Sequence, residues 1–297
     1  MKRRFFTLDV FTATRIAGNP LAVVLEPGGL DDAAMQTIAR EFGHPETVFV
    51  FKPDDPAHRA RLRIFTPGRE IPFAGHPTVG TAVLMAHLDG GAGKRDLVLS
   101  ERIGPVSCTV APGGEGGEAS FVVPRLPERL GGVRNPTALP SALSLAPSDV
   151  GFDGHAPANW TAGNSFTFVP VRGLDAIRRA RPDPSNWAAA FGPDDPHGAF
   201  LYCRETADPA HHFHARMFAP AMGVNEDPAT GSAAAAFAGI LAAGGPSDGE
   251  HGFVIEQGYE MGRPSLINLS LAMRSGALAQ AKVGGNAVIV TEGTIEA

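Results

Sequence analysis

The stretch Gly223-Val224-Asn225-Glu226-Asp227-Pro228-Ala229-Thr230-Gly231-Ser232 decides the fold, because this tight polar loop runs directly into an alanine-rich segment. Four alanines at 233–236 and an apolar run at 237–243 favour a helix, and Gly244-Gly245 predicts its end. A helix N-terminus carries unsatisfied N–H donors and a positive partial charge, so it favours anionic groups. The stretch therefore predicts a carboxylate, a hydroxyl and backbone donors gathered at one helix N-terminus.

A second copy of this arrangement lies in the first half of the chain. Gly75-His76-Pro77-Thr78-Val79-Gly80-Thr81-Ala82 precedes another apolar run at 83–88. When the two prolines are aligned, His76 takes the place of Asp227, and the offset of 151 positions is close to half of the 297 residues. Both side chains are expected at helix starts, where the local sequence also allows them to be plain caps.

Two further landmarks repeat in the same order. Gly18-Asn19-Pro20 is echoed by Gly163-Asn164-Ser165, and Arg63-Ile64-Phe65-Thr66-Pro67 is echoed by Arg216-Met217-Phe218-Ala219-Pro220. A single short match arises easily by chance, whereas three matches in one order indicate an internal duplication.

The duplication predicts an α+β protein of two pseudo-symmetric lobes, each a mixed sheet around a central helix, with the active site in the cleft between them. We place the N-terminal lobe at 1–118, completed by a C-terminal strand at 283–297, and the C-terminal lobe at 119–282. In the first lobe, Asp31 is expected to cap a helix at 32–42, which Gly43 ends.

Composition narrows the class of protein. Hydrophobic residues make up 43% of the chain and charged residues 19%, which is typical of a globular protein with enough apolar residues to form cores. The net charge of -6 argues against nucleic acid as a partner, and no apolar run is long enough to span a membrane. With only Cys108 and Cys203, a disulfide framework is excluded, and the cytoplasm is the expected compartment.

Glu46 is the candidate general base. It follows Pro45 and precedes the β-forming run Thr47-Val48-Phe49, where partial desolvation would raise the pKa of its carboxyl towards the working pH. The local sequence alone leaves open that Glu46 is a solvated residue at a strand edge.

The histidines of His211-His212-Phe213-His214 raise the question of a metal site, since alternate residues of a strand share a face. In the repeat, His212 and His214 align with Arg59 and Arg61, which indicates a solvated face. We therefore expect no metal and a solvent-facing position for both histidines. The two cysteines fall in strand patterns and are expected to be core residues.

Several short motifs cover nearly the whole chain. They are Asp9-Val10-Phe11, Gly18-Asn19-Pro20-Leu21-Ala22-Val23, Met35-Gln36, Ala39-Arg40-Glu41-Phe42, Glu46-Thr47-Val48-Phe49-Val50, Phe65-Thr66-Pro67, Glu70-Ile71-Pro72-Phe73-Ala74-Gly75-His76-Pro77-Thr78, Glu226-Asp227-Pro228-Ala229-Thr230-Gly231-Ser232-Ala233, Gln257-Gly258 and Gly262-Arg263-Pro264-Ser265. Together these motifs resemble the phenazine-biosynthesis PhzF-like isomerase family.

The resemblance implies the diaminopimelate-epimerase-like fold, a homodimer and no cofactor. It implies that Glu46 is the catalytic acid/base and that His76 and Asp227 complete the catalytic set. It also implies a small anionic substrate, bound with the help of Asn19, Gly75, Thr230, Gly231 and Ser232.

Three functions compete. The first is a cofactor-independent isomerase in which Glu46 moves a proton between two carbons of a small carboxylate-bearing substrate. The second is an amino-acid racemase or epimerase, which needs two acid/base groups on opposite faces of one carbon. The paired loops contain no cysteine, which argues against two-thiol chemistry of that kind. The third is a non-catalytic small-molecule binding protein.

Overall fold

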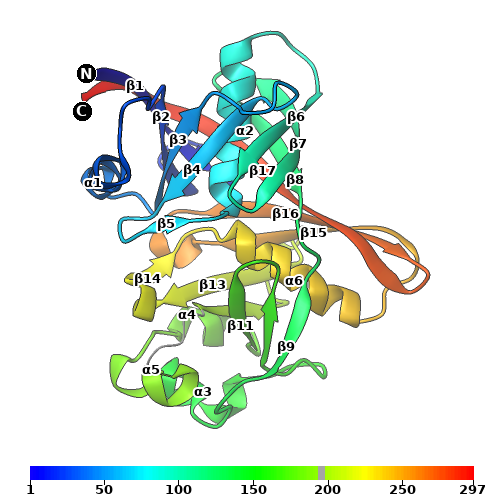
Figure 1. Cartoon of the computed structure of the whole chain (residues 1–297). Coiled ribbons are helices and arrows are strands. Elements are labelled where there is room, and N and C mark those ends of the chain that lie inside the picture. Colours follow the sequence, from blue (N-terminus) through cyan, green and yellow to red (C-terminus); the bar gives the residue numbers. More distant parts are fainter. Residues whose placement is uncertain (193–197) are drawn as a thin grey trace. The chain divides into compact units, whose positions relative to one another are not determined.

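The computed structural model describes residues 1–192 and 198–297 and divides the chain into two compact units (Figure 1). The first unit comprises Met1–Pro124 and Lys282–Ala297, and the second comprises Arg125–Ala281. Both units combine a mixed sheet with a few helices, so the predicted α+β class is confirmed. No helix within the described ranges has the length and apolarity needed to cross a membrane.

The strands of the first unit form a closed ring. Its elements are β1 (Lys2–Val10), β2 (Asn19–Leu25), α1 (Asp32–Phe42), β3 (Glu46–Phe51), β4 (Ala60–Phe65), β5 (Glu70–Ile71), α2 (Gly75–Asp89), β6 (Arg95–Glu101), β7 (Gly104–Gly113), β8 (Gly116–Val122) and most of β17 (Ala277–Glu296). Pairing runs β1, β2, β3, β4, β6, β7, β8, with β2–β3 and β4–β6 parallel and the others antiparallel. β17 then pairs with both β8 and β1, which closes the ring.

Helix α2 is the core of this unit. It contacts β1, β2, β7 and β8, and every residue from Gly75 to Ala86 is buried. A helix that is apolar on all sides has to be enclosed by other elements. Gly80 permits this close packing, because a Cβ there would lie 2.7 Å from side-chain carbons of both Leu21 and Val10.

Helix α1 begins and ends as the sequence predicts. Asp31 caps it by accepting a hydrogen bond from the Ala34 N–H at 2.8 Å, and Gly43 ends it with a φ of 64°. That left-handed conformation favours glycine, which has no Cβ to clash with the backbone.

The second unit surrounds helix α6 (Gly231–Ala243). Its other elements are β9 (Glu128–Gly132), α3 (Leu139–Ala142), η1 (Pro147–Asp149), β10 (Ala158–Thr161), β11 (Ser165–Pro170), α4 (Leu174–Arg179), α5 (Pro184–Phe191), β12 (Gly198–Cys203), β13 (Phe213–Ala219), η2 (Pro220–Met222), β14 (Val224–Asp227), β15 (Gly249–Gln257), η3 (Tyr259–Met261) and β16 (Ser265–Arg274). The small alanines of α6 are fully buried against the strands, and Phe237 lies 5.0 Å from Phe213 between ring centroids. Apolar residues of α3, α4 and α5 form a separate cluster with β11 and β12.

Strand registers repeat between the two units. In the first unit, β4 and β6 pair Ala60 with Leu99 and Arg61 with Ser100. In the second, β13 and β15 pair Phe213 with Ile255 and His214 with Glu256. The offsets are 153 positions on one strand and 156 on the other in both pairs, as an internal duplication requires.

A two-oxygen ion pair repeats as well. The guanidinium of Arg63 binds both oxygens of Glu70 at 2.8 and 2.7 Å, and that of Arg216 binds both oxygens of Glu226 at 2.7 and 2.8 Å. In each unit the pair joins a central strand to a short neighbouring strand.

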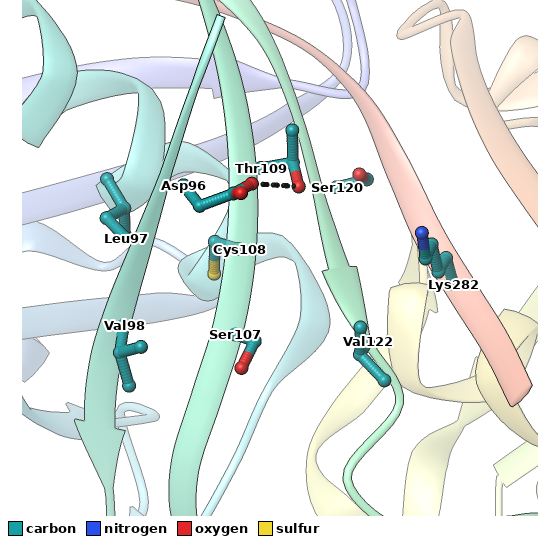
Figure 2. Close-up of a pocket in the computed structure, with 9 residues that line it drawn as sticks. All are labelled: Asp96, Leu97, Val98, Ser107, Cys108, Thr109, Ser120, Val122 and Lys282. Atoms are coloured by element: carbon teal, nitrogen blue, oxygen red, sulfur yellow. Dashed lines mark hydrogen bonds between the residues drawn. The ribbon is translucent and has the colours of Figure 1, made fainter.

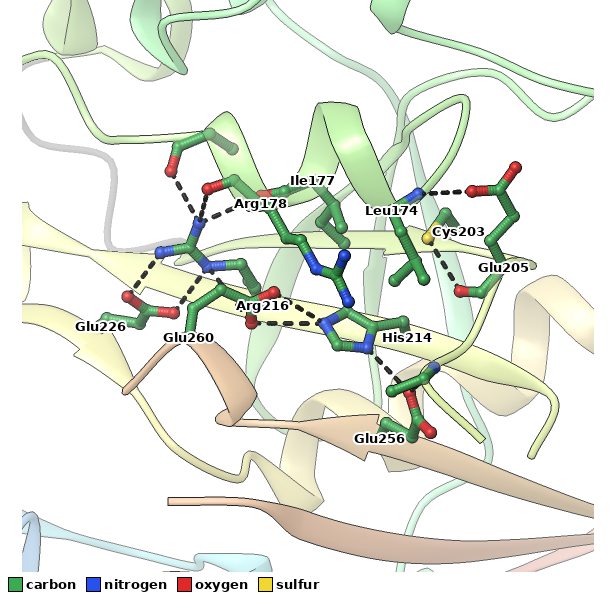
Figure 3. A network of polar contacts seen from close by, with 12 residues as sticks. Leu174, Ile177, Arg178, Cys203, Glu205, His214, Arg216, Glu226, Glu256 and Glu260 are labelled. Atoms are coloured by element: carbon green, nitrogen blue, oxygen red, sulfur yellow. Dashed lines mark hydrogen bonds and ion pairs between the residues drawn. The ribbon is translucent and has the colours of Figure 1, made fainter. Parts of the chain in front are cut away.

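The prediction of a solvent-facing His214 is wrong, although His212 is exposed as expected. His214 is fully buried between two carboxylates, with Nδ1 2.8 Å from Glu256 and Nε2 3.0 Å from Glu260 (Figure 3). Burial opposes a charge on the ring, but Glu260 and Glu256 raise the pKa of His214 above its ordinary value. The repeat misled the prediction because Ser100 occupies the place of Glu256 in the first unit, and Glu260 lies on η3.

The expectation of matching helix starts is also wrong for Asp227. His76 is the second residue of α2, whereas Asp227 is the last residue of β14 and lies four positions before α6 begins. Pairing of Asp227 with Met217 keeps this segment extended, which moves the start of the second helix to Gly231.

Candidate active site

Glu46 and His76 meet in the first unit. Glu46 opens β3, whose parallel pairing with β2 places it opposite Leu21. Its side chain is 17% exposed, and its Oε2 lies 3.5 Å from Nδ1 of the buried His76. The carboxyl is therefore partly desolvated and close to a second polar group.

The His76 imidazole is neutral. Burial lowers its pKa to about 3, a hydrogen bond with the Pro20 backbone opposes the shift, and His44 adds to it. The contact with Glu46 has ion-pair distance, but a neutral ring makes it a polar contact without a charge pair. The second ring nitrogen, Nε2, is buried and has no hydrogen-bond partner within the described part of the chain.

The start of α2 and the start of β2 supply the other predicted residues of this unit. Gly75 is the first residue of α2, and the N-cap residue Ala74 provides no side-chain hydrogen bond to the first turn. Asn19 is fully buried at the start of β2, opposite Val10 of β1. Gly18 precedes it at a φ of 63°, where a Cβ would lie 2.4 Å from the Val10 carbonyl oxygen, so only glycine fits.

Asp227 and Thr230 meet in the second unit. The Thr230 hydroxyl donates a hydrogen bond of 2.6 Å to Asp227 Oδ2, and both residues are buried. Gly231 and Ser232 form the first turn of α6, where Gly231 is buried and Ser232 is half-buried. A carboxylate, a hydroxyl and a helix N-terminus are thus gathered in one loop. That this set and the Glu46–His76 pair act on one substrate stays a prediction.

Sequence reasoning gave no role to Gln257 or Glu101. Gln257 is fully buried and holds the Asp227 loop through three hydrogen bonds. Glu101 is buried and contacts Thr78 of α2 at 2.7 Å. The Gln257-Gly258 motif was a usable signal for the first, whereas nothing in the local sequence distinguishes Glu101 from an exposed glutamate.

The cysteines are buried in strands, as predicted, and neither belongs to the paired loops at 75–82 and 223–232. Cys108 belongs to β7 and Cys203 to β12. Burial raises the pKa of Cys203 to about 12 and that of Cys108 further, so both thiols stay protonated at neutral pH.

A hollow of about 220 Å³ lies on strands β6, β7 and β8 of the first unit and on Lys282 (Figure 2). Its lining includes Asp96, which accepts a hydrogen bond from Thr109, and the unreactive Cys108. None of the predicted site residues lines it. Across residues 1–192 and 198–297, no cluster of three or more His, Cys, Asp or Glu side chains has the arrangement of a metal site.

Comparisons with known proteins agree with the fold and the motifs. A family model described as "Phenazine biosynthesis-like protein" matches residues 8–293. An uncharacterized isomerase of Mesorhizobium japonicum is 49% identical over 298 residues, covering 99% of this chain and 98% of the relative. The trans-2,3-dihydro-3-hydroxyanthranilate isomerase of Pseudomonas fluorescens is 34% identical over 295 residues, covering 98% of each chain.

A solved structure shows the same fold over the full length. The phenazine biosynthesis protein of the PhzF family from Bacillus anthracis is 26% identical, with a TM-score of 0.89 and 100% coverage of both chains. The diaminopimelate-epimerase-like fold implied by the motifs is therefore confirmed. From the family match, the named relatives and the shared fold, we conclude that the chain belongs to the phenazine biosynthesis-like (PhzF-like) family and is an isomerase.

Proposed function

We propose that the protein is a cofactor-independent isomerase in which Glu46 moves a proton between two carbons of a small carboxylate-bearing substrate. The observation that carries this proposal is the half-buried Glu46 carboxyl 3.5 Å from a neutral, buried His76. A carboxylate in such surroundings is less solvated than one in water, and it is therefore a better proton acceptor.

The proposed reaction moves one proton, which Glu46 removes from the substrate and later returns to it. Glu46 accepts a proton as a C–H bond breaks, and the electron pair enters the adjoining unsaturated system of the substrate. The protonated Glu46 then returns the proton to a different carbon as the double bonds move. No other reactant is required, and the enzyme ends in its starting form.

His76 and the polar loops have separate roles in this proposal. A neutral His76 does not hold Glu46 ionised through a full charge pair, and in this proposal its imidazole forms a hydrogen bond with the substrate. The N-terminal turns at Gly75 and Gly231, with Asn19 and Ser232, favour an anionic substrate and the negative charge that develops during proton removal. Asp227 and Thr230 orient the substrate.

The second candidate, a two-thiol racemase or epimerase, finds no support in the chain. Such chemistry needs two reactive groups on opposite faces of one carbon, and both cysteines are buried in strands with raised pKa values. A thiol in that state is a poor base at neutral pH.

Replacing Glu46 tests the proposal. We expect Glu46→Gln to abolish both turnover and exchange of carbon-bound substrate hydrogen with solvent deuterium, because the amide cannot accept the proton. General acid/base catalysis contributes about 10²- to 10⁴-fold, and loss of the sole base should reach or exceed this range. The probe is trans-2,3-dihydro-3-hydroxyanthranilate, the compound in the name of the Pseudomonas fluorescens relative, followed by NMR in deuterium oxide.

Glu41→Gln, at an exposed position of α1, is the matched control and should behave as the wild type. Unchanged exchange in the Glu46→Gln protein would move the chemistry to another group. If neither the wild type nor Glu46→Gln exchanges the substrate hydrogen, this compound is not the substrate. The assay would then be repeated with other small unsaturated carboxylates.

We also propose a cytoplasmic homodimer that binds neither nucleic acid nor membranes. The net charge of -6 argues against nucleic acid, and the homodimer is what the resemblance to the family implies. Sedimentation velocity should give twice the 31.0 kDa mass of one chain, and a single-chain mass at micromolar concentration would reject the dimer.

A further inference from the structure

In each unit, the strand that follows the central helix ends in a buried polar side chain. β6 ends in Glu101, and β15 ends in Gln257. The two strands pair with equivalent neighbours in the same register, since Leu99 of β6 pairs with Ala60 of β4 as Ile255 of β15 pairs with Phe213 of β13. Glu101 and Gln257 are 156 positions apart, which is the offset of these paired residues, so they are structural equivalents.

Gln257 fixes the loop that carries Asp227. Its Oε1 accepts from the Thr230 N–H at 3.0 Å, and its Nε2 donates to the Asp227 carbonyl at 2.8 Å and to the Thr230 hydroxyl at 3.0 Å. The Thr230 hydroxyl in turn donates to Asp227 Oδ2 at 2.6 Å. The Thr230 hydroxyl thus accepts a hydrogen bond from Gln257, at the end of β15, and donates one to the Asp227 carboxylate in the loop.

Thr78 and Glu101 make the equivalent arrangement in the first unit. Thr78 Oγ1 lies 2.8 Å from the Ala74 carbonyl oxygen and 2.7 Å from Glu101 Oε1. A carbonyl oxygen can only accept, and the hydroxyl has one hydrogen to donate. Both contacts are complete hydrogen bonds when the hydroxyl donates to Ala74 and a protonated Glu101 donates to the hydroxyl.

The surroundings of Glu101 agree with a neutral carboxyl. No cation forms an ion pair with it within the described part of the chain, and its Oε2 is buried without a hydrogen-bond partner. The titratable neighbour is Cys108 of β7, whose own pKa is raised, so its thiol carries no charge. Burial raises the pKa of Glu101 from 4.5 to about 8.

We propose that Glu101 and Gln257 are paired positioning residues, and that Glu101 works as a neutral acid equivalent to the Gln257 amide. Glu101 holds the first turn of α2, which carries His76, and Gln257 holds the loop that carries Asp227. Their effect on catalysis rests on the proposed function, whereas the neutral state of Glu101 and the anchoring by Gln257 do not.

The pH dependence of stability tests the neutral state of Glu101. The folded protein keeps the Glu101 proton in a range where the unfolded chain has lost it. This contribution to stability is therefore complete below pH 4.5, falls as the pH rises towards 8, and is lost above that value. Glu101→Gln has the same shape and no proton to lose. Its unfolding midpoint in urea should rise relative to wild type as the pH increases from 5 to 8.

Infrared spectroscopy supplies the direct readout and the control. Wild-type protein at pH 7 should show the C=O stretch of a protonated carboxyl, and Glu101→Gln should lack it. Glu41→Gln, at an exposed position, should leave both the band and the pH dependence unchanged. A wild-type protein without the band, or with the same pH dependence as Glu101→Gln, would overturn the proposal.

Gln257→Glu tests the anchoring. A carboxyl at this position donates at most one hydrogen bond when protonated, where the amide donates two, and when ionised it donates none and repels the Asp227 carboxylate. We expect kcat for trans-2,3-dihydro-3-hydroxyanthranilate to fall about 10- to 100-fold at pH 8, as small displacements of catalytic groups can cause. Because a protonated carboxyl keeps one of the two hydrogen bonds that the amide donates, activity relative to wild type should recover in part as the pH is lowered. Gln280→Glu, on an exposed part of β17, should show neither effect.

Hydrogen exchange keeps this test independent of catalysis. The Thr230 amide, which donates to Gln257, should exchange faster in Gln257→Glu than in wild type at pH 8. If wild-type protein does not turn over the compound but Thr230 exchange responds, the substrate is wrong and the anchoring stands. If turnover is normal in Gln257→Glu and Thr230 exchange is unchanged, the positioning role is wrong.

Discussion

His76 illustrates how burial sets the chemistry of a single side chain. A ring that stays neutral at all working pH values serves as a hydrogen-bonding group and does not act as a pH-dependent charge beside Glu46. Since burial lowers its pKa to about 3, the His76 ring should not titrate between pH 8 and pH 5. Long-range ¹H–¹⁵N NMR of labelled protein, with free histidine as the titrating reference, checks this. A His76 signal that moves with the reference would contradict it.

Arg216 illustrates how one charge can organise a buried region. It is 2% exposed, binds both oxygens of Glu226 and donates to the carbonyl of Ile177 (Figure 3). It also donates to the carbonyl of Ala180. Removal of the guanidinium leaves Glu226 without its main counter-charge. We expect Arg216→Met to destabilise the protein by about 3–5 kcal/mol, measured by urea unfolding.

Arg63→Met is the matched control for this prediction, because Arg63 makes the same two-oxygen pair with Glu70 in the first unit. The Arg63 side chain is 19% exposed, and Glu70 keeps a second partner in Arg102, so the loss should be smaller. Equal losses in the two variants would mean that burial of the pair is not the deciding factor.

At the scale of elements, the turn after β15 holds the Asp227 loop by close backbone packing. Gly258 and Gly262 flank η3 with φ values of 78° and 68°. A Cβ at Gly258 would lie 2.5 Å from the Arg263 carbonyl oxygen and 2.6 Å from that of Pro228, whereas one at Gly262 meets nothing within 4 Å.

Alanine substitutions at these glycines should therefore differ. Gly262→Ala should lower the stability of the protein only through its left-handed backbone, by about 1–2 kcal/mol. Gly258→Ala has the same backbone cost, and its Cβ must also displace the backbone of Pro228 and Arg263. We therefore expect a larger loss of stability and a fall in kcat for Gly258→Ala. Thermal unfolding and turnover of both variants provide the comparison. Similar stability of the two proteins would show that the contact with Pro228 is unimportant.

At the scale of the whole molecule, the main question is whether the polar sets of the two units serve one substrate. If they do, His76→Ala and Asp227→Asn should not have additive effects on kcat/KM. We expect an interaction energy of about 0.5–3 kcal/mol from the double-mutant cycle, which is the range for groups that share a partner. Additive effects, with each single variant impaired, would indicate that the two sets act independently.

The sequence by itself determined much of this protein. The repeated loops and landmarks predicted the duplication, and the alanine-rich run predicted a central helix, because a helix that is apolar on all sides has to be enclosed. Asp31 and Gly43 fixed the ends of α1, since capping and left-handed backbone are local effects. The motifs around Glu46 and Asp227 were specific enough to indicate the family.

Only the tertiary structure decided the state of the polar residues. His214 aligned with the partly exposed Arg61, yet Glu256 and Glu260 enclose it from segments more than 40 positions away. Glu101 resembles any surface glutamate in sequence, and its neutral character follows from Thr78 and from burial beneath α2. Local sequence determines helices, caps and turns, because the interacting groups are close along the chain. The protonation and contacts of a buried polar group depend on residues that folding brings together, so they are decided by the tertiary structure.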